Sequence, residues 1–497
     1  MPSPTVPTTL IYLYALINYA QQYTSTSQSI ILIHQFEFTP SDISIYYATI
    51  FTMWTIRPVY AYISDNWIIQ NGVYGRRKPY IIIGAVTALI GTVGQYSYIH
   101  TVDWSIYNQA DNNKVLNLYV LCSMLINMGM AISSMCLDTI SVEFGNKSVA
   151  DSKYTAISQS ISSHSDTQSG SNSPSNKPLL NSITIDPTQL SVQPINYTND
   201  DTTPTINVRS SIQSRCMFYR TCGSTSAAFL SILSLYIAEP DTLILINTIP
   251  FILAIIVAVN MIDTYNPHTL DHTPHITDRH LLNSSRVQQY KRACYVLWRP
   301  MIFLFIYNVL PDSADAYNTY LYSEYRDEIS AWQYSMFDLI GLLGSLSGVT
   351  LYTKLMTRIS LTQVFVIATL LACATGFTQL ALISHINLTI LHLPNTIFVP
   401  LINFIISLFA SVASIPPLVI ASESCPAELQ LEGTMFSLYQ AVNHVASLIS
   451  AATAAQIALL LSITNTNFNN LYIMIIMSQC LSVIPLCLLR VLHQSSK

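Results

Sequence analysis

The chain carries very little charge. Only 9% of its 497 residues are Asp, Glu, Lys or Arg, whereas a soluble domain contains about 25%, and 51% of the residues are hydrophobic. Because this shortage extends along the whole sequence, it excludes an ordinary soluble domain and predicts a protein that crosses the lipid bilayer several times. The net charge of −5 says little about partners, since the charged residues lie between the apolar segments, and no nucleic-acid partner is expected.

Other common features are also absent. The nine cysteines include no CxxC pair, so neither a zinc site nor a disulfide scaffold is indicated, and we expect no metal and no cofactor. No nucleotide-binding motif is present, which excludes ATP as a direct source of energy. Residues 1–9 contain no basic segment, so we expect no cleavable signal peptide. Glycine is scarce, at 14 residues, and Ala, Ser and Thr are therefore expected to take the small positions between helices.

What the sequence does contain is a series of apolar segments of about 20 residues, the length that a helix needs to cross the hydrocarbon core. Twelve such spans are predicted, and a polar stretch between the sixth and the seventh divides them into two sets of six. The predicted spans are Leu10–Ile33, Ile43–Ser64, Tyr80–Ile99, Val115–Ile140, Cys216–Ile237, Thr242–Ile262, Pro300–Tyr322, Ala331–Tyr352, Leu361–Ile383, Thr396–Ala421, Thr434–Leu461 and Leu471–Leu492.

The distribution of basic residues supports this layout. If the N-terminus lies in the cytoplasm, the outer loops contain only Lys114 and Arg326 among the 21 Lys and Arg residues. This agrees with the excess of basic residues that cytoplasmic loops carry. We therefore expect a multi-pass membrane protein with both termini in the cytoplasm, located in the plasma membrane rather than in an organelle.

Three parts follow from the spans: a first six-helix bundle in residues 1–262, a cytoplasmic linker in residues 263–297, and a second bundle in residues 298–497. The loop 141–212 is rich in Ser, Thr, Asn, Asp and Pro and is expected to be disordered, either as a tolerated insertion or as a regulatory phosphorylated segment. The linker contains four histidines, but their spacing follows no known ligand pattern, so a solvated linker is expected rather than a metal site.

The densest group of charges lies in the loop between the second and third spans. Arg57 and Asp65 end the second span, and Arg76 and Arg77 precede the third. The N-terminal N–H groups of the eleventh span point to the same side of the membrane, and a carboxylate near them is stabilised by about 0.3–1 kcal/mol. We therefore expect Asp65 to bind close to Thr434 when this side of the protein is closed.

A second acidic pair, Asp138 and Glu143, lies at the cytoplasmic end of the fourth span. These carboxylates could pair with Arg57 or with the basic cluster at residues 76–78. In either case the charged residues on this side would form a cytoplasmic gate.

Ionisable residues within spans are costly and are therefore candidates for function. Pro311 interrupts the hydrogen bonds of the seventh span near mid-membrane, and Asp312 and Asp315, three residues apart, share one helix face. Asp338 lies about two turns into the eighth span. We expect these carboxylates to face a water-filled central cavity, where they could carry a proton or bind a cationic group. Alternatively, Asp312 and Asp315 line its outer mouth.

Two basic residues could bind an anionic group. Arg220 lies about one turn inside the fifth span, and Arg299 lies at the inner end of the seventh. Either could meet the carboxylate of a substrate when the cavity opens inward. The alternative for both is a helix-end anchor whose charge reaches the membrane surface.

Three stretches of the chain resemble one family, the folate–biopterin transporters of the major facilitator superfamily. They are the pattern Arg-Pro, Asp, Arg-Arg-Lys-Pro-Tyr in residues 57–80, RPMIFLFIYNVLPDSADAYNTYLY in residues 299–322, and PPLVIASESCPAELQLEGTMFSLYQAVNH in residues 416–444. The last stretch adds Glu432 to the residues of the expected gate. The sequence departs from the family pattern at Ala61, where the family usually has Gly.

The resemblance implies an all-α membrane protein of the major facilitator type, with twelve transmembrane helices in two six-helix bundles, that is a transporter and not an enzyme. It implies secondary active transport of folate or a related pterin by alternating access, with proton coupling as one option. Two alternatives stay open: a transporter of S-adenosylmethionine or another small organic metabolite, and a non-transporting membrane receptor or scaffold. The expected partners are the lipid bilayer and a small molecule of the folate or pterin class, and the protein is expected to be monomeric.

Overall fold

The described structure is almost entirely helical. The computed structural model describes residues 7–34, 40–67, 77–101, 112–166, 203–237, 240–261, 298–325, 331–355, 359–424, 432–464 and 467–488. Across these ranges no β-strand occurs, apart from a single bridge between Thr464 and Asn467. The expectation of an all-α protein is confirmed.

The first half of the chain forms helices that follow the predicted spans. They are α1 (Thr8–His34), α2 (Pro40–Thr55), α3 (Arg57–Asn66), α4 (Lys78–Thr101), α5 (Asn112–Asp166), α6 (Thr203–Ile237), α7 (Pro240–Ile246) and α8 (Thr248–Val259). The predicted second span is divided into α2 and α3 at Ile56, because Pro58 in the first turn of α3 has no N–H to continue the helix.

The second half begins with a helix over residues 298–309. It continues with α10 (Ala314–Glu324), α11 (Ala331–Leu355), α12 (Leu361–Gly376), α13 (Gln379–Ile383), α14 (Ile386–Thr389), α15 (Asn395–Ser424), α16 (Glu432–Leu460), α17 (Leu471–Ser482) and α18 (Ile484–Cys487). The predicted break at Pro311 is confirmed, because residues 310–313 are not helical. The Ser450 hydroxyl donates to the carbonyl oxygen of Leu310 (2.5 Å) and thereby satisfies one of the groups that the break releases.

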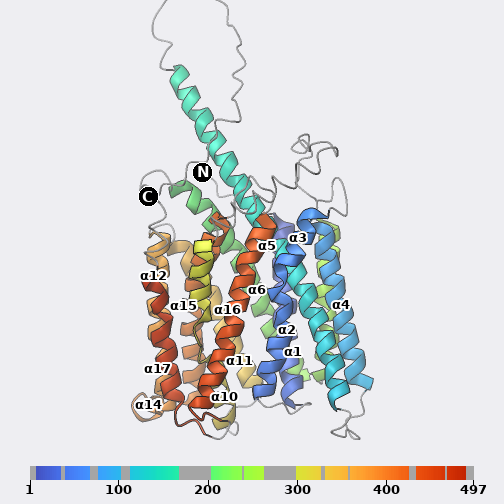
Figure 1. Cartoon of the computed structure of the whole chain (residues 1–497), viewed down its shortest axis with the longest axis vertical. Coiled ribbons are helices and arrows are strands. Elements are labelled where there is room, and N and C mark those ends of the chain that lie inside the picture. The colour runs from blue at the N-terminus through green and yellow to red at the C-terminus, as the bar shows by residue number, and fades with distance from the viewer. Residues whose placement is uncertain are drawn as a thin grey trace, which may run out of the picture.

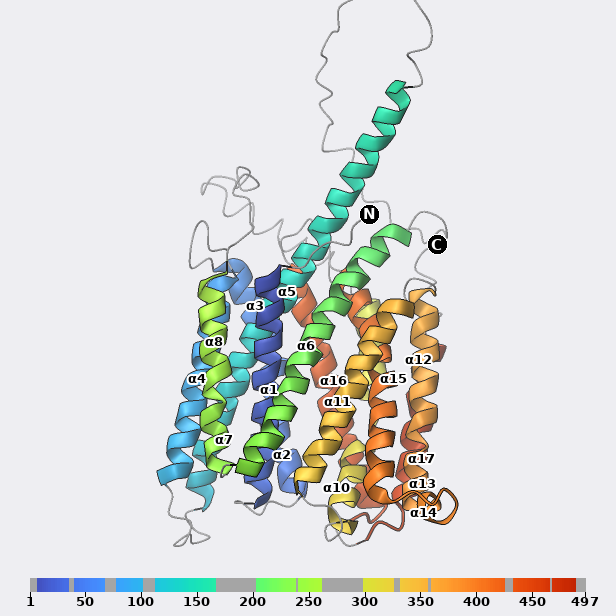
Figure 2. The ribbon, with the colours of Figure 1, turned by 180° about the vertical axis from the view of Figure 1, so that it is seen from behind.

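The helices stand side by side, with the two halves of the chain next to each other (Figures 1 and 2). The halves meet where α6 packs against α11 and α15, and where α16 packs against α2, α3 and α5. We call the end at which α1, α4 and α16 begin the basic end, because Arg77 and Lys78 lie there, and the other the far end. Beyond the basic end, α5 projects out of the bundle (Figure 1).

The helix α5 corrects the expectation of disorder from residue 141. It continues to Asp166, and α6 already begins at Thr203. The first residues beyond the predicted boundary are held by tertiary contacts: Val142 is buried, and Glu143 pairs with Arg77. Polar composition alone could not reveal these contacts. The remainder of the expected loop, residues 167–202, and the linker 263–297 lie outside the described residues.

Six described helices are long and apolar enough to cross a membrane: Lys78–His100, Asn117–Gly145, Ser335–Leu355, Leu361–Ile383, Asn395–Ser422 and Gly433–Leu460. Two shorter apolar helices are Leu243–Val259 and Leu471–Cys487. The other predicted spans also coincide with helices, but these contain breaks or many polar residues. The count of twelve crossings therefore stays a prediction.

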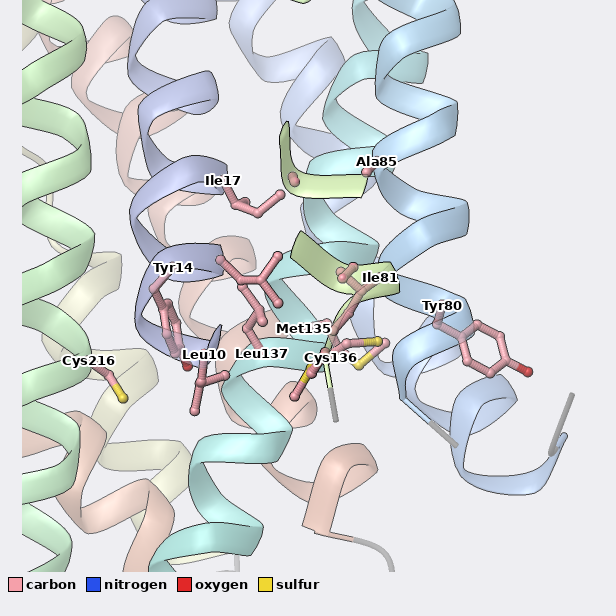
Figure 3. Packing of buried hydrophobic residues seen from close by; sticks show 14 of the residues in the cluster. Leu10, Tyr14, Ile17, Tyr80, Ile81, Ala85, Met135, Cys136, Leu137 and Cys216 are labelled. Atoms are coloured by element: carbon pink, nitrogen blue, oxygen red, sulfur yellow. The ribbon is translucent and has the colours of Figure 1, made fainter. Parts of the chain in front are cut away.

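Close helix packing depends on the few glycines as well as on Ala, Ser and Thr. A Cβ added to Gly84 of α4 would lie 2.6 Å from the carbonyl oxygen of Gly129 in α5, so the two backbones touch directly. Nearby, α1, α4, α5 and α6 enclose a hydrophobic cluster that includes Leu10, Ile81 and Met135 (Figure 3). This cluster gives the basic end of the first half a rigid core, on which the charged residues described next are placed.

The glycosylation sequon at Asn387 is expected to stay unmodified when the protein is made in a eukaryotic cell. The Asn387 side chain is fully buried, and its amide nitrogen donates to Asn395 Oδ1 (2.7 Å) and to the carbonyl oxygen of Leu393 (3.3 Å). Treatment with an endoglycosidase should therefore leave the electrophoretic mobility unchanged. If the membrane orientation were the reverse of the expected one, the sequons at Asn146, Asn196 and Asn283 would face the lumen, and a shift mapped to any of them would contradict the orientation.

Candidate functional site

At the basic end, Arg77 holds together three helices of the first half. Its Nη2 lies 2.5 Å from Asp65 Oδ1 and 2.9 Å from Glu143 Oε1, and its Nη1 donates to Ser64 Oγ (2.5 Å). Asp65 belongs to α3, Arg77 precedes α4, and Glu143 belongs to α5. The guanidinium and the Asp65 carboxylate are nearly inaccessible to solvent, so this ion pair is screened little by water.

Asp65 also connects the first half to the second. Its Oδ2 accepts a hydrogen bond from the backbone N–H of Thr434 (2.9 Å) and another from the Thr434 hydroxyl. Thr434 lies in the first turn of α16, where unpaired N–H groups and the helix dipole favour a carboxylate. The contact expected from the sequence is confirmed. We refer to Asp65, Arg77, Glu143 and Thr434 together as the Arg77 lock.

Gly433 permits the close approach of Arg77 to the start of α16. A Cβ at this position would lie 2.8 Å from Arg77 Nη2 and 2.9 Å from a Thr139 methyl carbon. Any larger residue would therefore push the N-terminus of α16 away from Arg77, and with it the N–H that binds Asp65.

A second charged group lies deeper in the first half, around Asp138. Arg57 Nη2 lies 2.8 Å from Asp138 Oδ2, and Arg220 Nη2 lies 3.5 Å from Oδ1. The Tyr14 hydroxyl donates to the same Oδ1 (3.1 Å); Figure 3 shows Tyr14 on α1 at the edge of the hydrophobic cluster. We call Tyr14, Arg57, Asp138 and Arg220 the Asp138 group. The sequence left open whether Asp138 pairs with Arg57 or with the basic cluster, and the structure selects Arg57.

The two groups carry opposite net charges. The Arg77 lock has one cation and two carboxylates, whereas the Asp138 group has two cations and one carboxylate. The excess negative charge at the lock is met by the N-terminus of α16 and by water, since the Glu143 side chain is 31% exposed. The excess positive charge of the Asp138 group lies deeper in the protein, where an unpaired charge is expensive.

Trp54 and His444 link the Asp138 group to the second half. The Arg57 guanidinium lies 5.4 Å from the centroid of the Trp54 ring, a distance typical of a cation–π contact. The Trp54 ring in turn lies 5.6 Å from the ring of His444 on α16, and its Nε1 donates to Asn127 Oδ1 (3.0 Å). The interface between the halves therefore passes through an aromatic pair directly beside the charged group.

A polar cavity of about 290 Å³ lies next to the Asp138 group. Most of its lining comes from amide and hydroxyl side chains of the first half, and Arg220 is the one charged residue among its described lining residues. The second half contributes Leu342, Ser345 and Ser411. The volume lies near the lower limit of roughly 300–1,000 Å³ for pockets that hold drug-sized ligands.

The polar stripe on α1 was not identified from the sequence. Asn18, Gln21, Gln22, Ser25 and Gln28 all line the cavity. Their spacing of three and four residues places them on one helix face, and this spacing within an apolar span is a signal that could have revealed them. Uncharged amides attract less attention in a hydropathy profile than carboxylates do.

The structure places the predicted carboxylates elsewhere. Asp312, Asp315 and Asp338 are exposed, and none of them is among the residues that line the cavity. Asp312 accepts a hydrogen bond from the N–H of Ala314 (3.2 Å) at the start of α10. These carboxylates therefore do not line this cavity, and both their expected place in a water-filled central space and their part in a proton pathway stay predictions.

Of the other predicted basic and acidic residues, one lines the cavity, one is exposed and two cannot be placed within the described structure. Arg220 lines the cavity, whereas Arg299 is exposed and lies over the Trp298 ring at 5.4 Å. Arg76 lies outside the described residues, and so does the side chain of Glu432. Lys78 donates to the carbonyl oxygens of Val259 (2.6 Å) and Met261 (3.1 Å), so it caps the C-terminus of α8.

Comparison with known proteins agrees with this architecture. The profile of the BT1 family matches residues 19–156 and 203–497. The chain belongs to the BT1 family. The resemblance inferred from the three sequence stretches is thus confirmed, and relatives in this family are named as transporters rather than enzymes.

Curated relatives of this BT1-family chain include three from distant organisms. Probable folate-biopterin transporter 2 of Arabidopsis thaliana is 22% identical over 57% of this chain and 56% of its own. Folate transporter 1 of Plasmodium falciparum is 27% identical over 40% of this chain and 38% of its own. The folate-biopterin transporter of a Synechocystis strain is 25% identical over 38% and 37% of the two chains. The alignments therefore cover between 37% and 56% of the length of these relatives.

Solved structures share the fold over nearly the whole chain. A D-xylose–proton symporter superposes with a TM-score of 0.60 at 12% identity and covers 97% of this chain and 96% of its own. The nucleoside transporter NupG superposes with a TM-score of 0.54 at 11% identity, over 97% and 98% of the two chains. At such low identity the likeness concerns the fold alone, which this chain shares with both transporters over nearly its whole length.

Proposed function

We propose that this protein is a secondary active transporter that moves folate or a related pterin across a membrane by alternating access. The observation that carries the proposal is the polar cavity beside the interface of the two halves, with Arg220 in its lining, in a structure whose halves are joined at the basic end by the Arg77 lock. A cavity of this kind, together with a breakable connection between two bundles at one end, is what alternating access requires.

The lining favours an anionic substrate with an uncharged polar head. Folate has carboxylates that a guanidinium can bind through two parallel hydrogen bonds, and a pterin ring offers donors and acceptors to the amides of α1. S-adenosylmethionine, the alternative considered from the sequence, carries a sulfonium cation that the excess positive charge of the Asp138 group would repel. A scaffold that binds no ligand would have no use for a half-buried cation facing a cavity, and this alternative is disfavoured for that reason.

The remaining assignments are part of the same proposal. The basic end faces the cytoplasm, because basic loops stay on that side, and the protein acts as a monomer in the plasma membrane. Asp315 and Asp338, together with Asp312, are the candidates for carrying a coupled proton, since they are carboxylates within predicted spans.

Uptake by cells that express the chain tests this function. Labelled folic acid and biopterin should accumulate several-fold above cells with an empty vector, whereas labelled S-adenosylmethionine should not. If a proton is coupled, the initial rate should be higher at acidic than at neutral external pH. Uptake of S-adenosylmethionine alone would contradict the anionic substrate, and uptake of none of the three compounds would favour the scaffold.

A further inference from the structure

The Asp138 carboxylate holds two arginines, but it does not hold them equally. Arg57 lies 2.8 Å from it, has a side chain only 3% exposed, and is fixed over the Trp54 ring. Arg220 lies 3.5 Å from it, and its side chain is 24% exposed. Arg220 also lies over an aromatic ring, that of Tyr14 at 5.7 Å, but its longer distance from Asp138 and its greater exposure make it the looser of the two partners.

Arg220 is also the partner that can reach a ligand. It lines the polar cavity on one side and, on the other, a small pocket that it shares with Tyr14 and Asp138. Its Nη2 donates to Ser134 Oγ (3.0 Å), and its buried Nε has no hydrogen-bond partner among the described residues. The guanidinium thus retains donors that an anion in the cavity could use.

We propose that Asp138 competes with the substrate for Arg220: it holds this arginine until the anionic group of a ligand displaces it, and it takes the arginine back when the ligand leaves. The inference rests on the proposed function and deepens it. When Arg220 moves to the ligand, Asp138 keeps Arg57 and the Tyr14 hydroxyl, so no carboxylate is left unpaired. The two cations are then matched by two anions, and the excess positive charge disappears.

Among the described residues, the surroundings supply no other anion for this purpose. The helices around the group contribute Tyr14 from α1, Arg57 from α3 and Arg220 from α6. The second half contributes His444, whose ring lies 5.6 Å from that of Trp54. Its Nε2 is buried and has no partner among the described side chains. A neutral His444 leaves the net charge at plus one, and a protonated His444 would increase it. An anionic ligand is therefore the group that neutralises the remaining positive charge of the Asp138 group.

The test compares binding and turnover in the Asp138→Asn variant. The full-length protein in lipid nanodiscs is assayed for equilibrium binding of labelled folic acid, an anion, and of biopterin, which is uncharged at neutral pH. Removing the competitor should tighten folic acid binding by roughly three- to tenfold and leave biopterin binding unchanged, whereas uptake should slow about tenfold because release is no longer assisted. Glu324→Gln, at an exposed carboxylate of α10, is the matched control and should change neither.

A double variant separates competition from a structural effect. In Arg220→Gln, adding Asp138→Asn should no longer tighten folic acid binding, because the two residues act on the ligand through each other. If Asp138→Asn does not fold, Asp138→Glu keeps the charge; its longer side chain should hold Arg220 more firmly and weaken folic acid binding. Unchanged or weaker binding in Asp138→Asn, with biopterin binding intact, would overturn the competition. Binding of neither compound by the unmodified protein would overturn the proposed function and the competition together, whereas binding of biopterin without folic acid would overturn the competition alone.

Discussion

Replacing Asp65 by Asn should open the basic end of the protein. Asn keeps the shape but loses the charge, so the ion pair with Arg77 disappears and the hydrogen bond from Thr434 becomes one between neutral groups. Hydrogen bonds to charged groups contribute about 1.5–3 kcal/mol and neutral ones about 0.5–1.5. The difference corresponds to a shift of roughly tenfold toward the open state. The Thr434 contact joins the two halves. Weakening it therefore changes the equilibrium between the closed and open states of the basic end, and not only the stability of the first half.

Cys216 offers a native reporter for this opening. It is buried and lines the small pocket at the junction of the halves, where Leu418 and Phe436 of the second half cover it. Its rate of alkylation by a membrane-permeant maleimide, followed by peptide mass spectrometry, should rise roughly tenfold in Asp65→Asn. Gly433→Ala should act in the same direction, because the added Cβ displaces Arg77. An unchanged rate in both variants, in protein that still elutes as a single species, would rule out the lock as a gate.

Replacing Arg220 by Gln should have the largest effect on folate transport. The substitution removes the charged residue among the described lining of the cavity, and with it a charge-assisted bond of about 1.5–3 kcal/mol. The apparent affinity for folic acid should therefore fall by roughly ten- to a hundredfold. The fold should tolerate the change, since Arg57 and Asp138 remain as a neutral pair at 2.8 Å.

Comparison of substrates and variants distinguishes recognition of the anion from damage to the protein. Uptake of biopterin should change far less than uptake of folic acid, because an uncharged pterin does not need the guanidinium. Arg220→Lys should recover part of the folic acid uptake, since Lys supplies the charge but not the planar fork of donors. Arg215→Gln, on the same helix but outside the cavity lining, is the matched control. Equal loss of both substrates in Arg220→Gln would argue for a structural role and against anion binding.

Several features of the site could be predicted because they depend on short stretches of sequence. The break at Pro311 follows from the missing N–H of one residue, and it is present. The contact between Asp65 and Thr434 joins residues far apart in the chain. It was nevertheless predictable, because the topology brings the start of the eleventh span to the same side as the loop after the second, and a helix N-terminus attracts a carboxylate.

Other features depended on which side chains packing brings together. Asp138 was recognised as a charged residue, but nothing in its neighbourhood in the sequence could show that it is shared by Arg57 and Arg220. The carboxylates that stood out in a hydropathy profile, Asp315 and Asp338, do not line the cavity. The residues that do line it are mostly uncharged amides and hydroxyls, which cost less inside a membrane protein and so leave a weaker trace in the composition.

The sequence by itself determined the helical class and the approximate positions of most helices. Backbone hydrogen bonds must be satisfied within lipid, which favours long apolar helices, and such helices can be recognised in windows of about 20 residues. The family was indicated by three short stretches of sequence. Only the tertiary structure decided where the cavity lies, that Arg220 lines it, that Lys78 caps α8, and that α5 continues to Asp166, beyond the predicted end of the fourth span. These outcomes depend on the distances between side chains from separate helices, and such distances are set by the packing of the whole bundle.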